Sequence, residues 1–265
     1  MFANVEDTGL EVVTAREDVA FTARRLHVHD IATQMEGLQR LSQALLNHPD
    51  TVLQELVNVA VTLCGADSAG ISIQIEDGTD REFYRWVATA GEYSGFLGAT
   101  LPRYPSACGM CLERGKAQHF TVDKRFFDIL NVEAPLVTDG ILLPWDAEGT
   151  RGTIFVMAHG RKEAFDESDV RLMEMLANFA AMGFKQQAQQ KRLVAQERAA
   201  AAAMMANELA HQINNPLQSM TNMAYMVESG TSEDPKSLGA GLSQEIRQLS
   251  RLVEKILLLP LVEAR

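Results

Sequence analysis

Ala69–Gly91 reads AGISIQIEDGTDREFYRWVATAG and contains two runs with the pattern of β-strands. In the first run, isoleucine occupies every second position (Ile71, Ile73, Ile75), polar residues lie between, and an Asp-Gly pair ends the run. A period of two places the isoleucines on one face of a strand, against a core. The second run, Glu82–Gly91, follows a short polar stretch and is the natural partner of the first. The stretch therefore predicts an antiparallel β-hairpin.

Helical periodicity precedes this hairpin. Between Ile31 and Leu63, apolar residues recur at every third or fourth position, with one break at an Asn-His-Pro-Asp sequence. The pattern predicts two amphipathic helices, the second capped by Asp50 or Thr51. Residues 1–30 are charged and irregular, so we expect an N-terminal arm that is loose or partly helical.

Further strands and a helix are predicted after the hairpin. Leu101–Lys116 has the composition of a loop, and a short strand-like segment, Ala117–Val122, follows it. Two apolar runs, GILLPW and GTIFVMAHG, flank a turn at Asp146–Gly149 and predict a second hairpin. In the sequence FDESD, Asp166 is placed to cap a helix and Asp169 lies three residues on, as in a capping box.

The order of these elements predicts an α+β domain at residues 31–185, with an antiparallel sheet and flanking helices. The phrases PSACGMCLERG, GILLPWDAEGTRGTIFVMAHG and FDESDVRLMEMLANFAAMGF resemble GAF domains, in particular those that precede bacterial sensor histidine kinases. The resemblance implies a sensor whose small-molecule ligand, unknown from the sequence, binds between the sheet and the loops on one face. Arg103 could hold an anion. The candidate ligand-binding residues, each of which can equally be a core or rim residue, are Tyr84, Trp86, Arg103, Tyr104, Phe120, Phe126 and Met157.

The three cysteines are too few, and odd in number, for a disulfide framework. Cys108 and Cys111 have C-x-x-C spacing, which suits a redox pair or a metal, while small buried thiols are the ordinary alternative. A zinc site would need two more ligands, and His119 is the nearest candidate. A lone His119 or His159 is equally weak support for a haem ligand, and we expect no metal.

A single long helix is predicted from about Glu167 to Glu228, because no proline occurs before Pro216 and no glycine after Gly183. Its middle part, residues 186–206, is rich in Ala, Gln, Lys, Arg and Glu, which are strong helix formers. We expect this part to be a helical linker, continuous with the elements on either side.

A turn at Glu228–Ser237 and a last helix to Pro260 follow. In both helices apolar residues recur at spacings of three and four, which predicts an antiparallel helical hairpin at residues 207–265. Because one hairpin buries only one seam, we expect a homodimer with a four-helix bundle. The first seam comprises Leu209, Ile213, Pro216, Met220, Met223 and Val227, and the second Leu238, Leu242, Ile246, Leu249, Val253 and Ile256.

His211 lies away from the first seam on a helical wheel, and Asn215 lies one turn further along the same face. An incidental surface histidine is the simplest interpretation of such a residue. However, LAHQINNPL resembles the H-box of the dimerisation and phosphoacceptor domain of histidine kinases. The resemblance implies that His211 is phosphorylated, that Asn215 orients a water for dephosphorylation, and that Pro216 bends the helix.

Gln212 departs from the family pattern, which usually has an acidic residue directly after the histidine. A glutamine can orient the imidazole ring but cannot accept its proton, so autophosphorylation should be slow. The sequence ends at Arg265 without an ATP-binding segment, and it contains no P-loop motif. We therefore expect no autonomous kinase activity: either the chain is a piece of a longer protein, or ATP and Mg²⁺ act only through a partner kinase domain.

Net charge and composition exclude other classes of protein. A net charge of −11 argues against a protein that binds nucleic-acid phosphates, and no leader or long apolar run predicts a membrane contact. We expect a cytoplasmic two-component signalling protein in which His211 exchanges phosphoryl groups with a partner kinase domain, a response regulator, or both. The alternative is a non-catalytic GAF dimer whose degenerate hairpin only assembles or docks a partner. A thiol-based GAF reductase that uses Cys108 and Cys111 is a third, more distant possibility.

Overall fold

The computed structural model describes residues 8–76, 78–231 and 234–257. The chain forms two compact units, Met1–Gln190 and Lys191–Arg265. None of the described helices is both long and apolar enough to cross a membrane.

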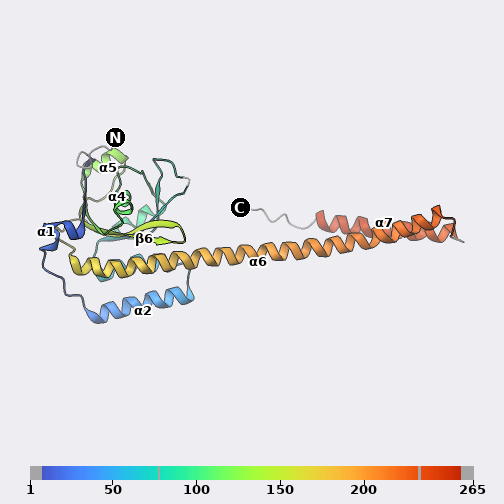
Figure 1. The fold of residues 1–265 in the computed structure, drawn as a ribbon, viewed down its shortest axis with the longest axis horizontal. Helices are drawn as coiled ribbons and strands as arrows, with labels where there is room; N and C mark the ends of the chain where they lie inside the picture. Colours follow the sequence, from blue (N-terminus) through green and yellow to red (C-terminus); the bar gives the residue numbers. More distant parts are fainter. Residues whose placement is uncertain (1–7, 77, 232–233, 258–265) are drawn as a thin grey trace. The chain divides into compact units, whose positions relative to one another are not determined.

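The first unit is built on an antiparallel sheet (Figure 1). Within the described part of the chain this sheet has seven strands, in the order β1-β5-β6-β7-β2-β3-β4. Their bounds are β1 Leu10–Thr14, β2 Ser68–Gln74, β3 Tyr84–Gly91, β4 Thr100–Leu101, β5 Gln118–Val122, β6 Val137–Ala147 and β7 Thr150–Ala158.

The hairpin predicted at Ala69–Gly91 is present as β2 and β3, which pair antiparallel with Ile71 opposite Ala88. A β-bulge interrupts the register between Ile71 and Ser72. The second predicted hairpin is β6 and β7, but β6 continues to Ala147, so the turn is shorter than expected. Glu148 and Gly149 both have positive φ angles, 51° and 88°, which suits a two-residue turn between twisted strands.

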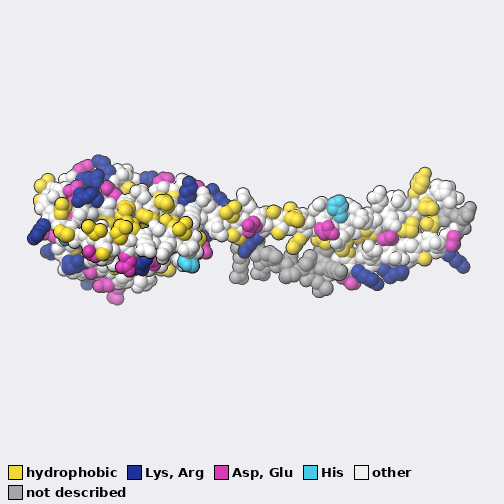
Figure 2. Space-filling model, turned by 90° about the horizontal axis from the view of Figure 1, so that it is seen from below, with side chains coloured by type: hydrophobic (Ala, Val, Ile, Leu, Met, Phe, Trp, Pro, Cys, Tyr) yellow, Lys and Arg dark blue, Asp and Glu magenta, His cyan; other side chains and the backbone are white. Residues whose placement is uncertain are grey.

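A helical layer covers one face of the sheet, and two short helices lie on the other (Figure 1). The helical layer consists of α2 (Ile31–Asn47), α3 (Val52–Cys64) and the first turns of α6 (Glu167–Glu228). Between this layer and the sheet lies a core that contains Leu56, Ile154 and Met173. The outer side of α2 leaves Ile31, Met35 and Leu46 at least 64% exposed, and Figure 2 shows apolar side chains gathered on the surface of this unit. The short helices on the opposite face are α4 (Ala107–Arg114) and α5 (Lys124–Leu130).

The arm expected at residues 1–30 is partly helical, as predicted, but within residues 8–30, which the structure describes, it also contains a strand of the sheet. β1 pairs with β5, and its residues alternate between buried and exposed. A 3₁₀ turn (Ala15–Glu17) and a short helix, α1 (Val19–Thr22), follow the strand. Asp18 caps α1 by accepting from the backbone N–H groups of Ala20 and Phe21. The strand has only three inward-facing positions, which are too few for a period of two to be recognised in the sequence.

The loop expected at Leu101–Lys116 is also wrong in part, because it contains the end of β4 and the whole of α4. Ser106 Oγ accepts from the backbone N–H of Gly109, which caps the helix at its start. Gly115 ends it in the left-handed conformation, with φ 63°. The cap residues of α4 could therefore be recognised in the sequence. The helix itself could not, because its apolar pattern covers only two turns.

The capping box predicted at the start of α6 is confirmed. Asp166 Oδ1 accepts from the backbone N–H groups of Ser168 and Asp169, and Asp169 Oδ2 accepts from that of Asp166. The helix spans the predicted Glu167–Glu228 without interruption, with Pro216 inside it.

In the second unit, α6 and α7 (Pro235–Leu257) form the predicted antiparallel hairpin (Figure 1). The helices approach closely at Gly241, where a Cβ atom would lie 2.8 Å from Met223 Sδ of α6. Pro216 of α6 is buried. The predicted end of the last helix, Pro260, and the last residues of the hairpin lie outside the described residues.

The seam predicted on α7 needs a correction. Ile246 and Val253 are 53% and 46% exposed, whereas the neighbouring Leu249 and Leu252 are half-buried. The side of α7 that contacts α6 is therefore rotated away from the predicted seam. The cause is that α7 has a broad apolar face, of which a single antiparallel partner covers only part.

Candidate functional site

A cavity of about 550 Å³ lies in the first unit, on the face of the sheet opposite the helical layer. On β7, Phe155 and Met157 line the cavity, while Ile154 and Val156, which alternate with them, belong to the core beneath the helices. This alternation follows from the pleat of the strand. The walls are strongly aromatic and are built from other strands, from α4 and α5, and from the 3₁₀ turn after β3. Trp86, Phe120 and Leu142 come from β3, β5 and β6, and the other elements contribute Tyr93, Phe96, Ala107, Phe126 and Phe127.

Five of the seven predicted ligand-binding residues line this cavity: Trp86, Tyr104, Phe120, Phe126 and Met157. The other two lie elsewhere. Tyr84 packs with Cys108 and Leu112, and burial raises its pKa to about 12. The guanidinium of Arg103 lies 5.0 Å from the centre of the Phe83 ring, as a cation over an aromatic face.

Sequence reasoning missed several lining residues, including Tyr93, Phe96 and Phe155. Phe155 had a usable signal, because it lies two positions before Met157 on the same strand and must share its face. Tyr93 and Phe96 belong to a 3₁₀ turn, and nothing in their local pattern points to the cavity.

The cavity has few polar groups. Tyr93 uses its hydroxyl group to donate a 2.6 Å hydrogen bond to the Pro135 carbonyl, and burial raises its pKa far above the usual value. The indole Nε1 of Trp86 is buried and has no hydrogen-bond acceptor. The largely apolar wall suits a small, mainly apolar molecule.

Both thiols of the C-x-x-C sequence are buried. Cys108 Sγ accepts hydrogen bonds from the hydroxyl groups of Thr153 and Ser72, at 3.2 and 3.5 Å. Burial raises the pKa of Cys108 despite these bonds, and it raises the pKa of Cys111 further. Since the thiolate is the reactive form, this environment favours inert thiols that fill the core.

The two histidines considered as ligands have both ring nitrogens engaged. His119 lies 2.6 Å from Asp139 Oδ1 and 3.0 Å from Asp18 Oδ2. His159 lies 2.7 Å from Ser68 Oγ and 2.9 Å from the Leu136 carbonyl oxygen. In this arrangement neither imidazole has a nitrogen free to bind a metal or haem.

In the second unit, His211, Gln212 and Asn215 are exposed on α6. The amide of Gln212 donates a 2.7 Å hydrogen bond to Glu208 Oε1, one turn earlier. A helix places residues four apart on one face, so His211 and Asn215 present their side chains on the same side of α6. This face is exposed, whereas Pro216 is buried.

Comparison with known proteins concerns the first unit. Residues 47–185 match the family model described as GAF domain. Among solved structures, a free methionine-R-sulfoxide reductase of Neisseria meningitidis is 17% identical, with a TM-score of 0.47 over 63% of this chain and 98% of that one. The GAF domain of a Coxiella burnetii phosphoenolpyruvate-protein phosphotransferase is 17% identical, with a TM-score of 0.46 over 60% and 98%. The phycoerythrobilin-bound GAF domain of a cyanobacterial phytochrome is 14% identical, with a TM-score of 0.43 over 63% and 100%.

No curated protein matches the chain. The family match begins within the last turn of α2 and ends in α6, so it contains every strand after β1 and all of the cavity lining except Leu10. It covers more than half of the sequence, and the chain therefore belongs to the GAF-domain family.

Proposed function

We propose that this GAF-domain signalling protein binds a small, mainly apolar molecule in its cavity and regulates phosphoryl transfer at His211. The observation that carries the proposal is the cavity of about 550 Å³ with aromatic walls, which is the size of a small-molecule site. The phosphoacceptor role is supported by the exposure of His211, by Asn215 one turn further, and by the resemblance of LAHQINNPL to an H-box.

The chemistry requires an exposed imidazole. One ring nitrogen of His211 attacks the phosphorus of ATP, held by a partner kinase domain, or of an aspartyl phosphate on a response regulator. The new P–N bond forms as the bond to the leaving oxygen breaks, and the other ring nitrogen gives up its proton to solvent or to a base. The reverse transfer returns the group to an aspartate.

Gln212 shapes this chemistry. Its amide has no proton-accepting capacity comparable to a carboxylate, and its NH₂ group is bound to Glu208. Transfer from ATP, which needs the imidazole proton removed, should be slower than exchange with an aspartyl phosphate, which is already an activated donor.

Labelling tests the phosphoacceptor proposal. The protein is incubated either with a histidine-kinase catalytic domain and labelled ATP, or with a response regulator labelled on aspartate. We expect acid-labile, base-stable label on the wild type and on His48→Ala, an exposed histidine of the first unit, and none on His211→Ala. Equal label on the wild type and His211→Ala would show that His211 is not the acceptor.

A second candidate function is a docking or assembly role for the hairpin without phosphorylation. The observation that favours it is the neutral Gln212 amide, already hydrogen-bonded within its own helix. This alternative predicts that a kinase domain co-elutes with the wild type on a size-exclusion column. Neither phosphoryl donor would transfer label to His211.

A further inference from the structure

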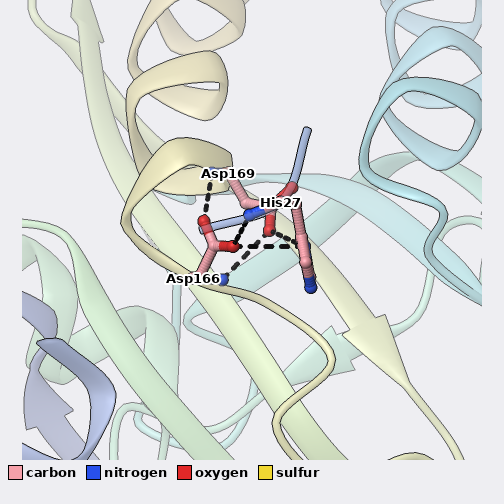
Figure 3. Close-up of side chains that lie close together, drawn as sticks. All are labelled: His27, Asp166 and Asp169. Carbon is pink, nitrogen blue, oxygen red and sulfur yellow. Dashed lines mark hydrogen bonds and ion pairs between the residues drawn. The ribbon is translucent and has the colours of Figure 1, made fainter. Parts of the chain in front are cut away.

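A cluster of two carboxylates and an imidazole lies where the N-terminal segment meets the start of α6 (Figure 3). His27 Nδ1 lies 2.9 Å from Asp169 Oδ2 and 3.4 Å from Asp166 Oδ2. Asp166 and Asp169 are near neighbours in α6, whereas His27 is 142 residues away from Asp169 in the sequence. Each of these residues can offer one ligand atom, and the three atoms lie within 4.8 Å of one another.

Asp169 is not satisfied by the groups around it. Its side chain is 0% exposed, and its Oδ1 atom accepts no hydrogen bond. His29 Nε2 lies 3.2 Å from that oxygen, but not in the direction needed for a hydrogen bond. Burial raises the pKa of Asp169, because a buried negative charge beside Asp166 lacks sufficient positive charge nearby. A buried carboxylate in this condition is stabilised by a bound cation.

The imidazole of the cluster is accessible from outside, whereas the two carboxylates are buried behind it. His27 has a side chain that is 43% exposed, and both His27 and His29 line a hollow of about 360 Å³ at the surface. The same hollow is lined by Thr62, Cys64 and Arg161. An ion and a water molecule can therefore reach the imidazole without a rearrangement of the fold.

We propose that His27, Asp166 and Asp169 form a binding site for one divalent transition-metal ion of the zinc type. One imidazole nitrogen and two carboxylate oxygens are ligands that Zn²⁺ accepts at about 2.0–2.2 Å, and two such ligands around a tetrahedral ion lie about 3.3 Å apart. The 3.4 Å separation of His27 from Asp166 is close to that spacing, and the 2.9 Å separation from Asp169 is shorter, so these two groups would move apart when the ion binds. A water on the side of the hollow completes the coordination.

Asp169 Oδ2, the oxygen next to His27, also accepts from the backbone N–H of Asp166, so it would serve the helix cap and the ion together. Asp166 uses Oδ1 for the backbone N–H groups of Ser168 and Asp169, so its Oδ2 atom is left for the ion and for the backbone N–H of His27. His29 is placed on the second oxygen of Asp169, from which it orients the ligand. The ion would join the segment at His27 to the first turn of α6, the helix that carries on to His211.

Metal titration of the full chain tests the proposal. After treatment with a chelator, the protein is titrated with Co²⁺, whose visible absorption reports a tetrahedral site, and then with Zn²⁺ in competition. We expect one saturable site per chain, with affinity reduced at least about 100-fold in His27→Gln and about 10-fold in His29→Gln. His48→Gln, an exposed histidine at the end of α2, serves as the matched control and should bind like the wild type.

The variants chosen keep the cap intact, because His27 and His29 contribute only side chains outside the capping box. Far-UV circular dichroism and thermal melting without metal should therefore be close to those of the wild type. Absence of saturable binding in the wild type, or equal affinity in His27→Gln, would overturn the proposal. Loss of binding in Cys64→Ser with His27→Gln unaffected would also overturn it, since it would place the ion on the thiol.

Discussion

At the scale of single residues, Asp139 holds the N-terminal segment to the sheet. Its buried carboxylate lies 2.7 Å from Arg24 Nη1 and 2.6 Å from His119 Nε2, and it accepts from the backbone N–H of Phe165 at 3.0 Å. Burial by itself would raise the pKa of Asp139, but the bonds from His119 and Arg24 outweigh it, and the pKa lies below 3.8. The carboxylate is thus a negative centre that Arg24 and His119 share.

This network predicts a dependence of stability on pH. Because the folded pKa is lowered, the contribution of Asp139 is fully present above the unfolded value of 3.8 and is lost as pH falls through the folded value. Asp139→Asn should lower the free energy of unfolding at pH 7 by about 3 kcal/mol, because the buried Arg24 loses its counter-charge. Urea denaturation at pH 7 and pH 3 measures both effects. The control is Asp146→Asn, at an exposed position, and a similar loss there would contradict the assignment.

A substitution at Gln212, the residue after His211, tests whether the absence of a carboxylate base slows phosphorylation by ATP. Gln212→Glu would restore a carboxylate where the resembling family has one. If His211 is the phosphoacceptor, labelling from ATP by a partner kinase domain should accelerate by about 100-fold, while exchange with a phosphorylated response regulator changes little. Repulsion between the new carboxylate and Glu208 limits the gain. Asn214→Asp adds the same charge two residues further along, at an exposed position, and should leave the rate of labelling unchanged. An equal acceleration in that variant would mean that charge alone is responsible.

At the scale of the elements, β1 is the part of the sheet that sequence patterns concealed. Val12 is 8% exposed and faces the core, whereas the next residue, Val13, is 45% exposed. Val12→Asp should therefore lower the free energy of unfolding by about 3 kcal/mol or more, because it buries a carboxylate among apolar groups. Val13→Asp should change it by less than about 0.5 kcal/mol. Denaturant titration of the two variants compares the two faces, and equal losses would mean that β1 is not a strand of the sheet.

The cavity formed by β7, α4 and α5 can be tested without knowledge of its ligand. Ala107 lies in its wall, so Ala107→Phe should fill part of the space. We expect the apolar dye 8-anilinonaphthalene-1-sulfonate to bind the wild type, to change the emission of Trp86, and to bind the variant at least about 10-fold more weakly. The melting temperature should remain within a few degrees. Ala195→Phe adds the same ring at an exposed position of α6, and equal weakening in that variant would show that the dye binds elsewhere.

The elements differ in how far the sequence could predict them. α6 was predictable end to end because helix formers and the capping pair at Asp166 act locally. β1, α4 and α5 are too short for a period to emerge, and their identity depends on partners far along the chain, such as β5 for β1. The same limit applies to the sites. The cavity draws on strands, helices and a 3₁₀ turn, and the cluster at His27 brings together residues separated by more than half of the chain.

At the scale of the whole molecule, the homodimer is a prediction. Exposed apolar residues of the second unit allow it to be tested. Ile246 and Val253 lie seven residues apart on α7 and are about half exposed, and Leu217 of α6 is 42% exposed. Apolar residues at a spacing of seven, left uncovered by the partner helix, are typical of a surface that pairs with a second copy. Covering them would convert the two-helix hairpin into a four-helix bundle.

Replacement of that stripe should separate the two copies. We expect the wild type to sediment as a dimer and Ile246→Glu with Val253→Glu to sediment as a monomer at micromolar concentration, because four carboxylates would otherwise be buried in one bundle. Ser243→Glu with Ser250→Glu adds the same charges at the same spacing on exposed positions of α7 and should leave the dimer intact. A monomeric wild type would remove the dimer from the proposal. A dimer that persists after the Ile246 and Val253 substitutions would show that the interface lies elsewhere. The exposed residues Ile31, Met35 and Leu46 of α2 would then be the next surface to mutate.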